Sequence, residues 1–367
     1  MKIAIIGTRG VPARYGGFET CVEEVGKRLA RRGHNVWVYS RASYYERKLD
    51  FYEGMRLVYL PHLESRTAET LSHTTVSLFH ALAKRTDVLF VFNSANSPLL
   101  ILPSLLGRNL VLHTDGLEWM RDKWRGWGRR YYRFMERLTA KLPCILISDS
   151  RAIVRHYREA YGRETRYISY GAPVVESRDP ALLGRFGLSP GGYFLQVARF
   201  EPENNQLLAA RAFEGLRTEK RLVLIGGAKY RSTYVESLAK FKDPRILFPG
   251  FCYEREILRE LLANSYAYVH GNEVGGTNPG LLQAMGAGAF VIARDVPFNR
   301  EVCGDAALYF RKDAADLREK MRWALDHEGE GRTFRERARK IIREQYDWDA
   351  VADEYERLFV DIIRGNA

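Results

Sequence analysis

A glycine-rich loop between residues 270 and 278 gathers the side chains with the clearest capacity for chemistry. It holds an imidazole, a carboxylate, a glycine pair and two further polar groups, namely His270, Glu273, Gly275, Gly276, Thr277 and Asn278. Paired glycines let a ligand approach the backbone closely, and the unpaired N–H groups at a helix N-terminus attract an anion. A simple chain reversal needs only the glycines, so the added polar groups indicate a ligand site.

The residues around this loop predict a strand, the loop, a short helix and a second strand. Apolar runs of strand length occupy 266–269 and 289–293. Asn278 is a good helix N-cap, and Pro279 suits the first helical position because the N–H that proline lacks would be unpaired there. The loop then lies at the carboxyl end of a strand, where open α/β sheets bind their ligands.

Two basic residues of the C-terminal half follow predicted strands in the same way. Arg199 comes after the predicted strand 193–197, and Lys229 comes after the predicted strand 222–225. Since the carboxyl ends of parallel strands share one edge of a sheet, both cations are expected on the same side as Glu273. A diphosphate needs cations placed in this way, although either residue alone is more often a surface charge.

The N-terminal half opens with an apolar run, 2–6, and a second glycine-rich loop, 7–17. This loop ends in the pair Gly16 and Gly17, where an amphipathic helix begins. It lacks the Gly-x-Gly-x-x-Gly spacing, and no acidic residue ends the second predicted strand, which argues against a nicotinamide cofactor. A glycine pair at a helix N-terminus suits a phosphate or a sugar. A turn with solvated arginines is the alternative.

His113 and Asp115 stand at the end of another predicted strand, 110–113, and are candidates for substrate binding. A histidine in that place is as often a hydrogen-bonded structural residue. Strands alternate with helices along the chain, which predicts an α/β fold of doubly wound parallel sheets. The 367 residues are enough for two domains, and a connection rich in proline and glycine places their boundary near 172–190.

The composition is that of a globular protein. Apolar residues make up 46% and charged residues 28% of the chain, and no apolar run approaches the roughly 20 residues of a membrane-spanning helix. The cysteines are scattered without ligand spacing, as expected of reduced thiols in a cytoplasmic protein. No metal site is expected, because Asp347 and Asp349 are better placed to cap the last helix.

The net charge of +12 implies an anionic partner, which could be nucleic acid, an acidic membrane surface or a phosphorylated ligand. Segment 119–141 is the most basic and aromatic part of the chain. This mixture suits an anionic membrane interface, but it could also bind single-stranded nucleic acid or pack its rings inward. No helix-turn-helix or RNP-type motif is present, so nucleic acid is not the expected partner.

Six phrases in the sequence resemble those of family 4 retaining glycosyltransferases with the GT-B fold, and in particular the bacterial β-1,4-rhamnosyltransferase-like branch. They are GTRGVPARYGGFE at 7–19, DGLEW at 115–119, YGA at 170–172, RFEPENN at 199–205, GGTNP at 275–279 and FNRE at 298–301. They follow one another in order over nearly the whole chain, which a shared fold alone would not produce.

The resemblance implies two Rossmann-like domains that face a cleft, with 1–172 binding the acceptor and 173–345 the donor, and a last helix, 346–367, that packs back toward the N-terminal domain. It implies a hexosyltransferase without cofactor or metal, because cationic side chains and helix N-termini take up the charge of the leaving diphosphate. The donor would be a nucleotide sugar, with dTDP-L-rhamnose as the best candidate, and the acceptor a polyprenyl-diphosphate-linked saccharide. The product would be a surface polysaccharide such as capsule or O-antigen, made at the inner face of the plasma membrane.

Residue roles follow from the same resemblance, position by position. Arg199 matches the phosphate-binding arginine and Glu273 the loop carboxylate near the donor sugar, while Asp115 or His113 would hold acceptor hydroxyls. Further donor contacts are implied for Gly275, Gly276, Thr277, Asn278, Gln283, Asn205, Lys229, Gly16 and Gly17. Acceptor contacts are implied for Arg14, Tyr15, Glu118 and Trp119.

Two departures from the family pattern leave other functions open. Gly275 and Gln283 occupy the positions of the family's two glutamates, with a carboxylate displaced to Glu273, and Asn204 or Asn205 replaces the family's lysine. One alternative is a weak or inactive nucleotide-sugar-binding protein, and another is a transferase that uses a UDP- or GDP-sugar. The charge of +12 leaves a nucleic-acid-binding protein as a third.

Overall fold

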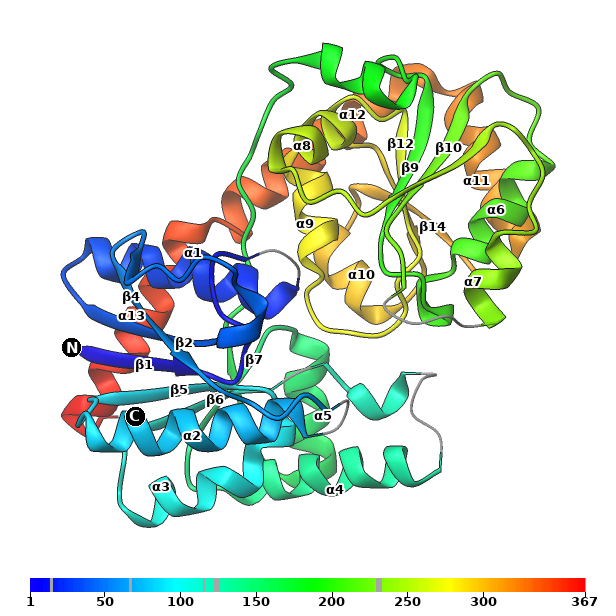
Figure 1. The fold of residues 1–367 in the computed structure, drawn as a ribbon. Coiled ribbons are helices and arrows are strands. Elements are labelled where there is room, and N and C mark those ends of the chain that lie inside the picture. Colours follow the sequence, from blue (N-terminus) through cyan, green and yellow to red (C-terminus); the bar gives the residue numbers. More distant parts are fainter. Residues whose placement is uncertain (14–15, 66–67, 115, 122–125, 229–232, 367) are drawn as a thin grey trace. The chain divides into compact units, whose positions relative to one another are not determined.

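The computed structural model describes residues 1–13, 16–65, 68–114, 116–121, 126–228 and 233–366. The chain divides into two compact units (Figure 1). The first comprises Met1–Tyr170 together with Trp348–Ala367, and the second comprises Gly171–Asp347. Within the described ranges, no helix is both long and apolar enough to cross a membrane.

The first unit is built on an eight-stranded sheet with the order β3-β4-β2-β1-β5-β6-β7-β8. Its strands are β1 Lys2–Ile6, β2 Asn35–Arg41, β3 Phe51–Tyr52, β4 Met55–Leu60, β5 Val88–Phe92, β6 Leu110–His113, β7 Ile145–Ser148 and β8 Arg166–Tyr167. They pair in parallel except for the hairpin of β3 and β4. Its helices are α1 Gly17–Arg31, α2 Glu69–Ala83, α3 Ile101–Leu105, α4 Trp127–Lys141, α5 Arg151–Tyr161 and α13 Trp348–Arg364, with the 3₁₀ segments η1 Ala42–Tyr44, η2 Ser94–Leu100 and η3 Glu118–Met120.

The second unit has a six-stranded parallel sheet with the order β11-β10-β9-β12-β13-β14. Its strands are β9 Tyr193–Val197, β10 Arg221–Ile225, β11 Ile246–Gly250, β12 Ala267–His270, β13 Val291–Arg294 and β14 Ala307–Phe310. Its helices are α6 Gln206–Glu214, α7 Thr233–Leu238, α8 Arg255–Ala263, α9 Pro279–Gly286, α10 Pro297–Cys303, α11 Ala314–Asp326 and α12 Glu328–Gln345, with the 3₁₀ segments η4 Pro180–Phe186 and η5 Pro202–Asn204.

The central strands of the second unit are buried on both faces. Along β9, Phe194 belongs to one hydrophobic core, whereas Tyr193 and Leu195 belong to the core on the opposite face. Successive side chains of a strand point to opposite faces, so a strand covered by helices on both sides is mostly apolar. The amide of the buried Gln196 on β9 is the exception, and it donates from Nε2 to the Asn204 carbonyl oxygen at 2.6 Å. The predicted α/β fold with two parallel sheets is confirmed, and Figure 1 shows helices flanking both sheets.

The last helix, α13, belongs to the first unit although it follows the second in sequence. Its Tyr355 and Phe359 are fully buried, with ring centroids 5.3 and 5.4 Å from that of Phe90 on β5. The Tyr355 hydroxyl also lies 3.9 Å from the Cys21 sulfur on α1. The end of the chain therefore completes the core of the N-terminal sheet.

Replacing Phe359 by alanine is expected to destabilise the first unit by about 3–5 kcal/mol, the usual cost of removing a buried phenyl ring. Ile363 is on the same helix but is 41% exposed, so Ile363→Ala is a matched control that should cost far less. Urea unfolding followed by circular dichroism would measure both. Equal losses in the two variants would contradict a core role for this face of α13.

Candidate active site

The second unit gathers charged side chains at the carboxyl edge of its sheet. Arg199 follows β9, Glu273 follows β12, Arg294 ends β13 and Lys312 follows β14. These strands are consecutive neighbours in the sheet. Because all of them are parallel, their carboxyl ends share one edge, which is the binding edge of open α/β sheets.

Helix α9 begins at the same edge, as expected from the sequence. The Asn278 side chain accepts hydrogen bonds from the backbone N–H groups of Gly280, at 2.9 Å, and Leu281, at 3.4 Å. This confirms Asn278 as the N-cap and Pro279 as the first helical residue. Gly275 has a φ of 151°, a backbone conformation that favours glycine, so the loop before the helix depends on this residue.

The Arg199 guanidinium is half-buried and has no ion pair or hydrogen bond with any residue that the structure describes. Its backbone is fixed, because its carbonyl oxygen accepts from Asn204 Nδ2 at 2.8 Å and Gln206 Nε2 at 2.6 Å. A positioned cation without a counter-charge is suited to bind an anion. The structure thus places an available positive charge where the sequence predicted one, while Lys229 lies outside the described residues.

Glu273 is held between two cations that the sequence analysis did not single out. Its carboxylate lies 3.0 Å from Arg294 Nε and 2.7 Å from Lys312 Nζ, and its backbone N–H donates to the Glu203 carbonyl oxygen at 3.0 Å. Both cations stand at the ends of strands in the same sheet, so the placement rule that selected Arg199 could have found them. The two ion pairs fix the orientation of the loop carboxylate.

Asn205 and Gln283 differ in how their amides are used. Asn205, at a φ of 59°, donates from Nδ2 to the Gly271 carbonyl oxygen at 2.8 Å and is buried. It therefore ties two loops together, and its role is to hold the site in shape. Gln283 is partly buried on α9, and its side chain makes no hydrogen bond within the described ranges, which leaves its amide available to a ligand.

The glycine-rich loop of the first unit is held by carboxylates from the helix that follows it. Glu19 accepts from the Arg9 N–H at 3.1 Å, and Glu23 accepts from the Ala13 N–H at 2.6 Å. Gly16, with a φ of 125°, caps α1, and a Cβ placed on it would come within 2.0 Å of Glu19 Oε2. A carboxylate at this helix start disfavours a phosphate there, so of the two expected ligands a sugar fits better. Gly17 begins the helix.

The structure does not support the predicted acceptor contact of His113, because this side chain has no exposed surface with which to touch an acceptor. Its ring stacks between Phe92 and Tyr170, with centroid distances of 5.1 and 5.6 Å. Nδ1 donates to the Thr114 carbonyl oxygen at 2.8 Å, and burial lowers the pKa of the imidazole to about 4. His113 is a neutral structural residue of the core. Asp115, Arg14 and Tyr15 lie outside the described residues.

The free energy of unfolding is expected to fall as the pH drops from about 6.5 towards about 4. Burial lowers the pKa of His113 to about 4 and that of His270 to about 3, whereas an unfolded chain protonates histidine near ~6.5. The unfolded state binds more protons in this range, so each histidine removes up to about 1.4 kcal/mol per pH unit as the pH falls.

Urea unfolding between pH 7 and pH 5 would test this dependence. His113→Phe keeps a ring between Phe92 and Tyr170 but cannot take up a proton, so its stability should fall less steeply than that of the wild type. His327 is exposed, and His327→Phe should keep the wild-type slope. The same slope in all three proteins would show that His113 is not neutral in the fold.

Glu118 and Trp119, both expected to contact the acceptor, take part in contacts within the first unit. Glu118 forms an ion pair with Arg121. Trp119 donates from Nε1 to Glu136 Oε2 at 3.0 Å, and the Arg133 guanidinium lies 4.4 Å from the centroid of its ring. Trp119 also lines a pocket in this unit.

The structure has two α/β units, each built on a mainly parallel sheet, and this is the fold of the GT-B glycosyltransferases. Residues 189–341 match the family "Glycosyl transferases group 1", and residues 1–173 match a family described as "Domain of unknown function (DUF1972)". The second unit therefore carries a glycosyltransferase group 1 domain, and the chain is an enzyme of the glycosyltransferase class. No curated protein matches the sequence.

Solved structures of glycosyltransferases share this fold over almost the full chain. HepE from Anabaena in complex with UDP has a TM-score of 0.80 at 17% identity and covers 98% of this chain and 100% of its own. Sucrose-phosphate synthase from Thermosynechococcus elongatus has a TM-score of 0.80 at 17% identity, with 99% of each chain covered. WaaG, involved in lipopolysaccharide biosynthesis, has a TM-score of 0.70 at 18% identity, covering 99% of this chain and 100% of its own.

Proposed function

We propose that this enzyme transfers a sugar from a nucleotide sugar, with dTDP-L-rhamnose as the best candidate, to a saccharide carried on polyprenyl diphosphate. The observation that carries the proposal is the Arg199 guanidinium, which has no partner among the described residues and lies at the edge where α9 begins, inside a glycosyltransferase group 1 domain. A nucleotide sugar as donor is further supported by HepE, which was solved with UDP and with UDP-glucose.

In the proposed reaction, the bond between the anomeric carbon and the diphosphate oxygen breaks while an acceptor hydroxyl attacks from the same face. The leaving phosphate takes the proton of that hydroxyl, so the anomeric configuration is retained. Arg199 and the positive end of the α9 dipole stabilise the charge that develops on the diphosphate, and no metal or cofactor is required for that role. Glu273, oriented by Arg294 and Lys312, would position the donor sugar, and Gln283 would contact the ribose.

The acceptor proposal is supported by an exposed apolar surface on the first unit. Helices α3 and α4 both pack against η2. These helices, together with Leu106 directly after α3, present large apolar side chains to solvent: Ile101, Leu102, Leu105, Leu106, Trp127, Tyr131 and Phe134. Arginines 129, 130 and 133 lie on the same α4. Apolar groups beside cations suit an anionic bilayer surface, and we propose that this surface holds the enzyme at the inner face of the plasma membrane.

A panel of donors tests the function directly. dTDP-rhamnose, UDP-glucose, UDP-galactose, UDP-N-acetylglucosamine and GDP-mannose would each be mixed with short polyprenyl-diphosphate glycans without metal, and the products read by mass spectrometry. Transfer from dTDP-rhamnose supports the full proposal, and transfer from a UDP- or GDP-sugar corrects the donor. Absence of both transfer and nucleotide binding would overturn it.

Gln283 favours one second candidate, a weak or inactive nucleotide-sugar-binding protein, because a neutral amide stands where the family has a carboxylate. Gln283→Glu is expected to tighten binding of the donor nucleotide by about three- to tenfold, since hydrogen bonds to charged groups are stronger than neutral ones. Calorimetry and initial rates would measure the change. A rise in turnover as well would favour the weakened enzyme, whereas weaker nucleotide binding would show that residue 283 does not face the ribose.

A further inference from the structure

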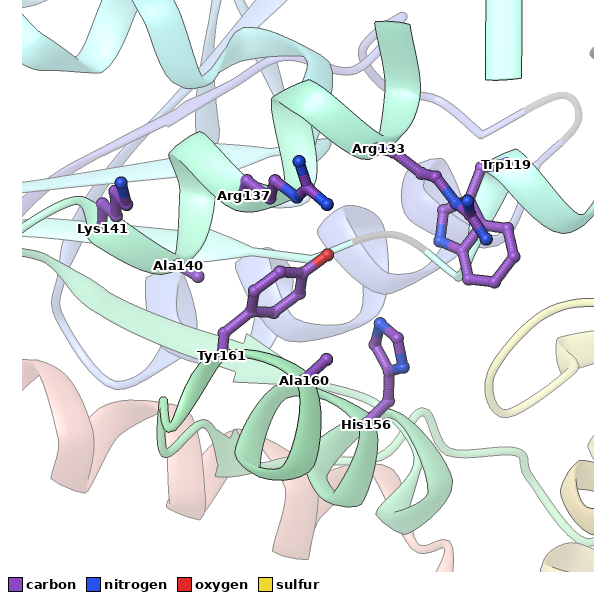
Figure 2. Close-up of a pocket in the computed structure, with 8 residues that line it drawn as sticks. All are labelled: Trp119, Arg133, Arg137, Ala140, Lys141, His156, Ala160 and Tyr161. Carbon is purple, nitrogen blue, oxygen red and sulfur yellow. The ribbon is translucent and has the colours of Figure 1, made fainter. Parts of the chain in front are cut away.

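The first unit contains a pocket of about 500 Å³ lined by residues of η3, α4 and α5 (Figure 2). Trp119 of η3 lies at one end beside Arg133, and Lys141 lies at the opposite end of the α4 side. His156 and Tyr161 of α5 form the facing wall. None of these side chains belongs to the sheet edge of the second unit that carries Arg199 and Glu273.

Three basic side chains line this pocket from a single helix. Arg133, Arg137 and Lys141 are spaced four residues apart on α4, which places them on one face. None of them forms an ion pair with a carboxylate in the part of the chain that the structure describes. By contrast, the exposed Arg158 on α5 pairs with Glu164 at 2.6 Å. The pocket thus keeps its positive charge available.

Glu136 lies on the same helix as these cations, is 6% exposed and already accepts hydrogen bonds from three donors. Its Oε2 accepts from Trp119 Nε1 at 3.0 Å, and its Oε1 accepts from His156 Nε2 and the Tyr161 hydroxyl, each at 2.7 Å. Burial and the Glu136 carboxylate raise the pKa of Tyr161, so its phenol stays protonated. Glu136 therefore fixes three of the side chains that line the pocket.

The aromatic end of the pocket is also fixed. The Arg133 guanidinium lies 4.4 Å from the centroid of the Trp119 ring, a contact typical of a cation–π pair. On α4, the exposed Trp127 and Phe134 lie on the neighbouring face of the same helix. A ligand in this pocket would meet several cations at once and have an apolar surface next to it.

We propose that this pocket binds a phosphate-bearing group, because several cations lining one pocket match the multiple charged oxygens of a phosphate or diphosphate. The group can come from free phosphate or from the headgroup of a lipid, and the exposed apolar residues beside it favour a lipid diphosphate. Identifying that lipid with the sugar acceptor rests on the proposed function; binding of the phosphate group does not.

The first test is calorimetric titration of the full-length protein with inorganic diphosphate, without any sugar donor. Arg137→Gln removes one charge from the pocket and is expected to weaken binding about 10-fold or more, since hydrogen bonds to charged groups contribute about 1.5–3 kcal/mol. Arg155 on α5 is equally exposed but does not line the pocket, so Arg155→Gln is the charge-matched control and should bind as the wild type does. Both substitutions lie in the first unit, so binding of diphosphate to the second unit should be equal in the two variants and cancels in the comparison.

A second test separates the sources by flotation with phosphatidylcholine vesicles. One set contains undecaprenyl diphosphate, and the other contains phosphatidylglycerol of equal total charge. If Arg137→Gln binds less than the wild type to the undecaprenyl diphosphate vesicles only, the ligand is a lipid diphosphate. If its binding falls equally with both vesicle sets, the ligand is an anionic headgroup in general. If Arg137→Gln weakens the binding of inorganic diphosphate but changes binding to neither vesicle set, the ligand of the pocket is a free phosphate group.

The proposal is overturned if Arg137→Gln and Arg155→Gln behave alike with inorganic diphosphate and with both vesicle sets. Should Arg137→Gln fold poorly, Lys141→Gln at the exposed end of α4 makes the same test. Because no donor and no turnover enter these measurements, a failure of the pocket is distinguishable from a failure of the glycosyltransferase assay.

Discussion

Replacing Arg199 by alanine is expected to lower kcat/KM for the nucleotide sugar by about 10- to 100-fold, because charge-assisted hydrogen bonds contribute about 1.5–3 kcal/mol. The guanidinium has no hydrogen bond or ion pair with the described residues, so its removal breaks no polar contact among them and the melting temperature should change little. Initial rates at several donor concentrations, together with a thermal melt, would measure both.

Arg199→Lys separates charge from geometry, since lysine keeps the cation but loses the planar fork of donors. The kcat/KM of Arg199→Lys is expected to lie between that of the wild type and that of the alanine variant. Arg322 on α11 is exposed, and Arg322→Ala is the control for a general loss of positive charge from the second unit. A wild-type rate for Arg199→Ala would remove the proposed phosphate contact.

Glu273→Gln is expected to slow turnover by about 10- to 100-fold while tightening the binding of the nucleoside diphosphate product. The amide keeps the size of the side chain but no longer neutralises Arg294 and Lys312, which lie 3.0 and 2.7 Å from the carboxylate. Those cations then act on the diphosphate, whereas the donor sugar loses its charged partner. Calorimetry with the nucleotide and single-turnover rates with the donor sugar would measure the two effects separately.

Glu319 is an exposed carboxylate on α11 that pairs with Lys320 at 3.4 Å, so Glu319→Gln makes the same change of charge elsewhere in the unit. It should leave both nucleotide affinity and turnover unaltered. If Glu273→Gln weakened nucleotide binding instead, the carboxylate would be acting chiefly to hold its loop in place.

The fold of the second unit was largely predictable because the signals are local. Continuous apolar runs such as 222–225 became buried strands, and the Asn278–Pro279 pair became a helix start. The identity of the domain as a glycosyltransferase group 1 domain agrees with the resemblance found in the motifs. The rhamnose donor and the lipid-linked acceptor stay predictions.

Sequence spacing alone determined where strands end, and hence that Arg199 and Glu273 belong to one sheet edge. Only the tertiary structure decided how their charges are used: Lys312 reaches Glu273 across 39 residues of chain, while no carboxylate in the described part of the chain pairs with Arg199. It also turned His113 from a candidate ligand contact into a buried ring between Phe92 and Tyr170. Periodicity reports the direction of a side chain along its own element, but charge pairing and burial depend on neighbours that are distant in the sequence.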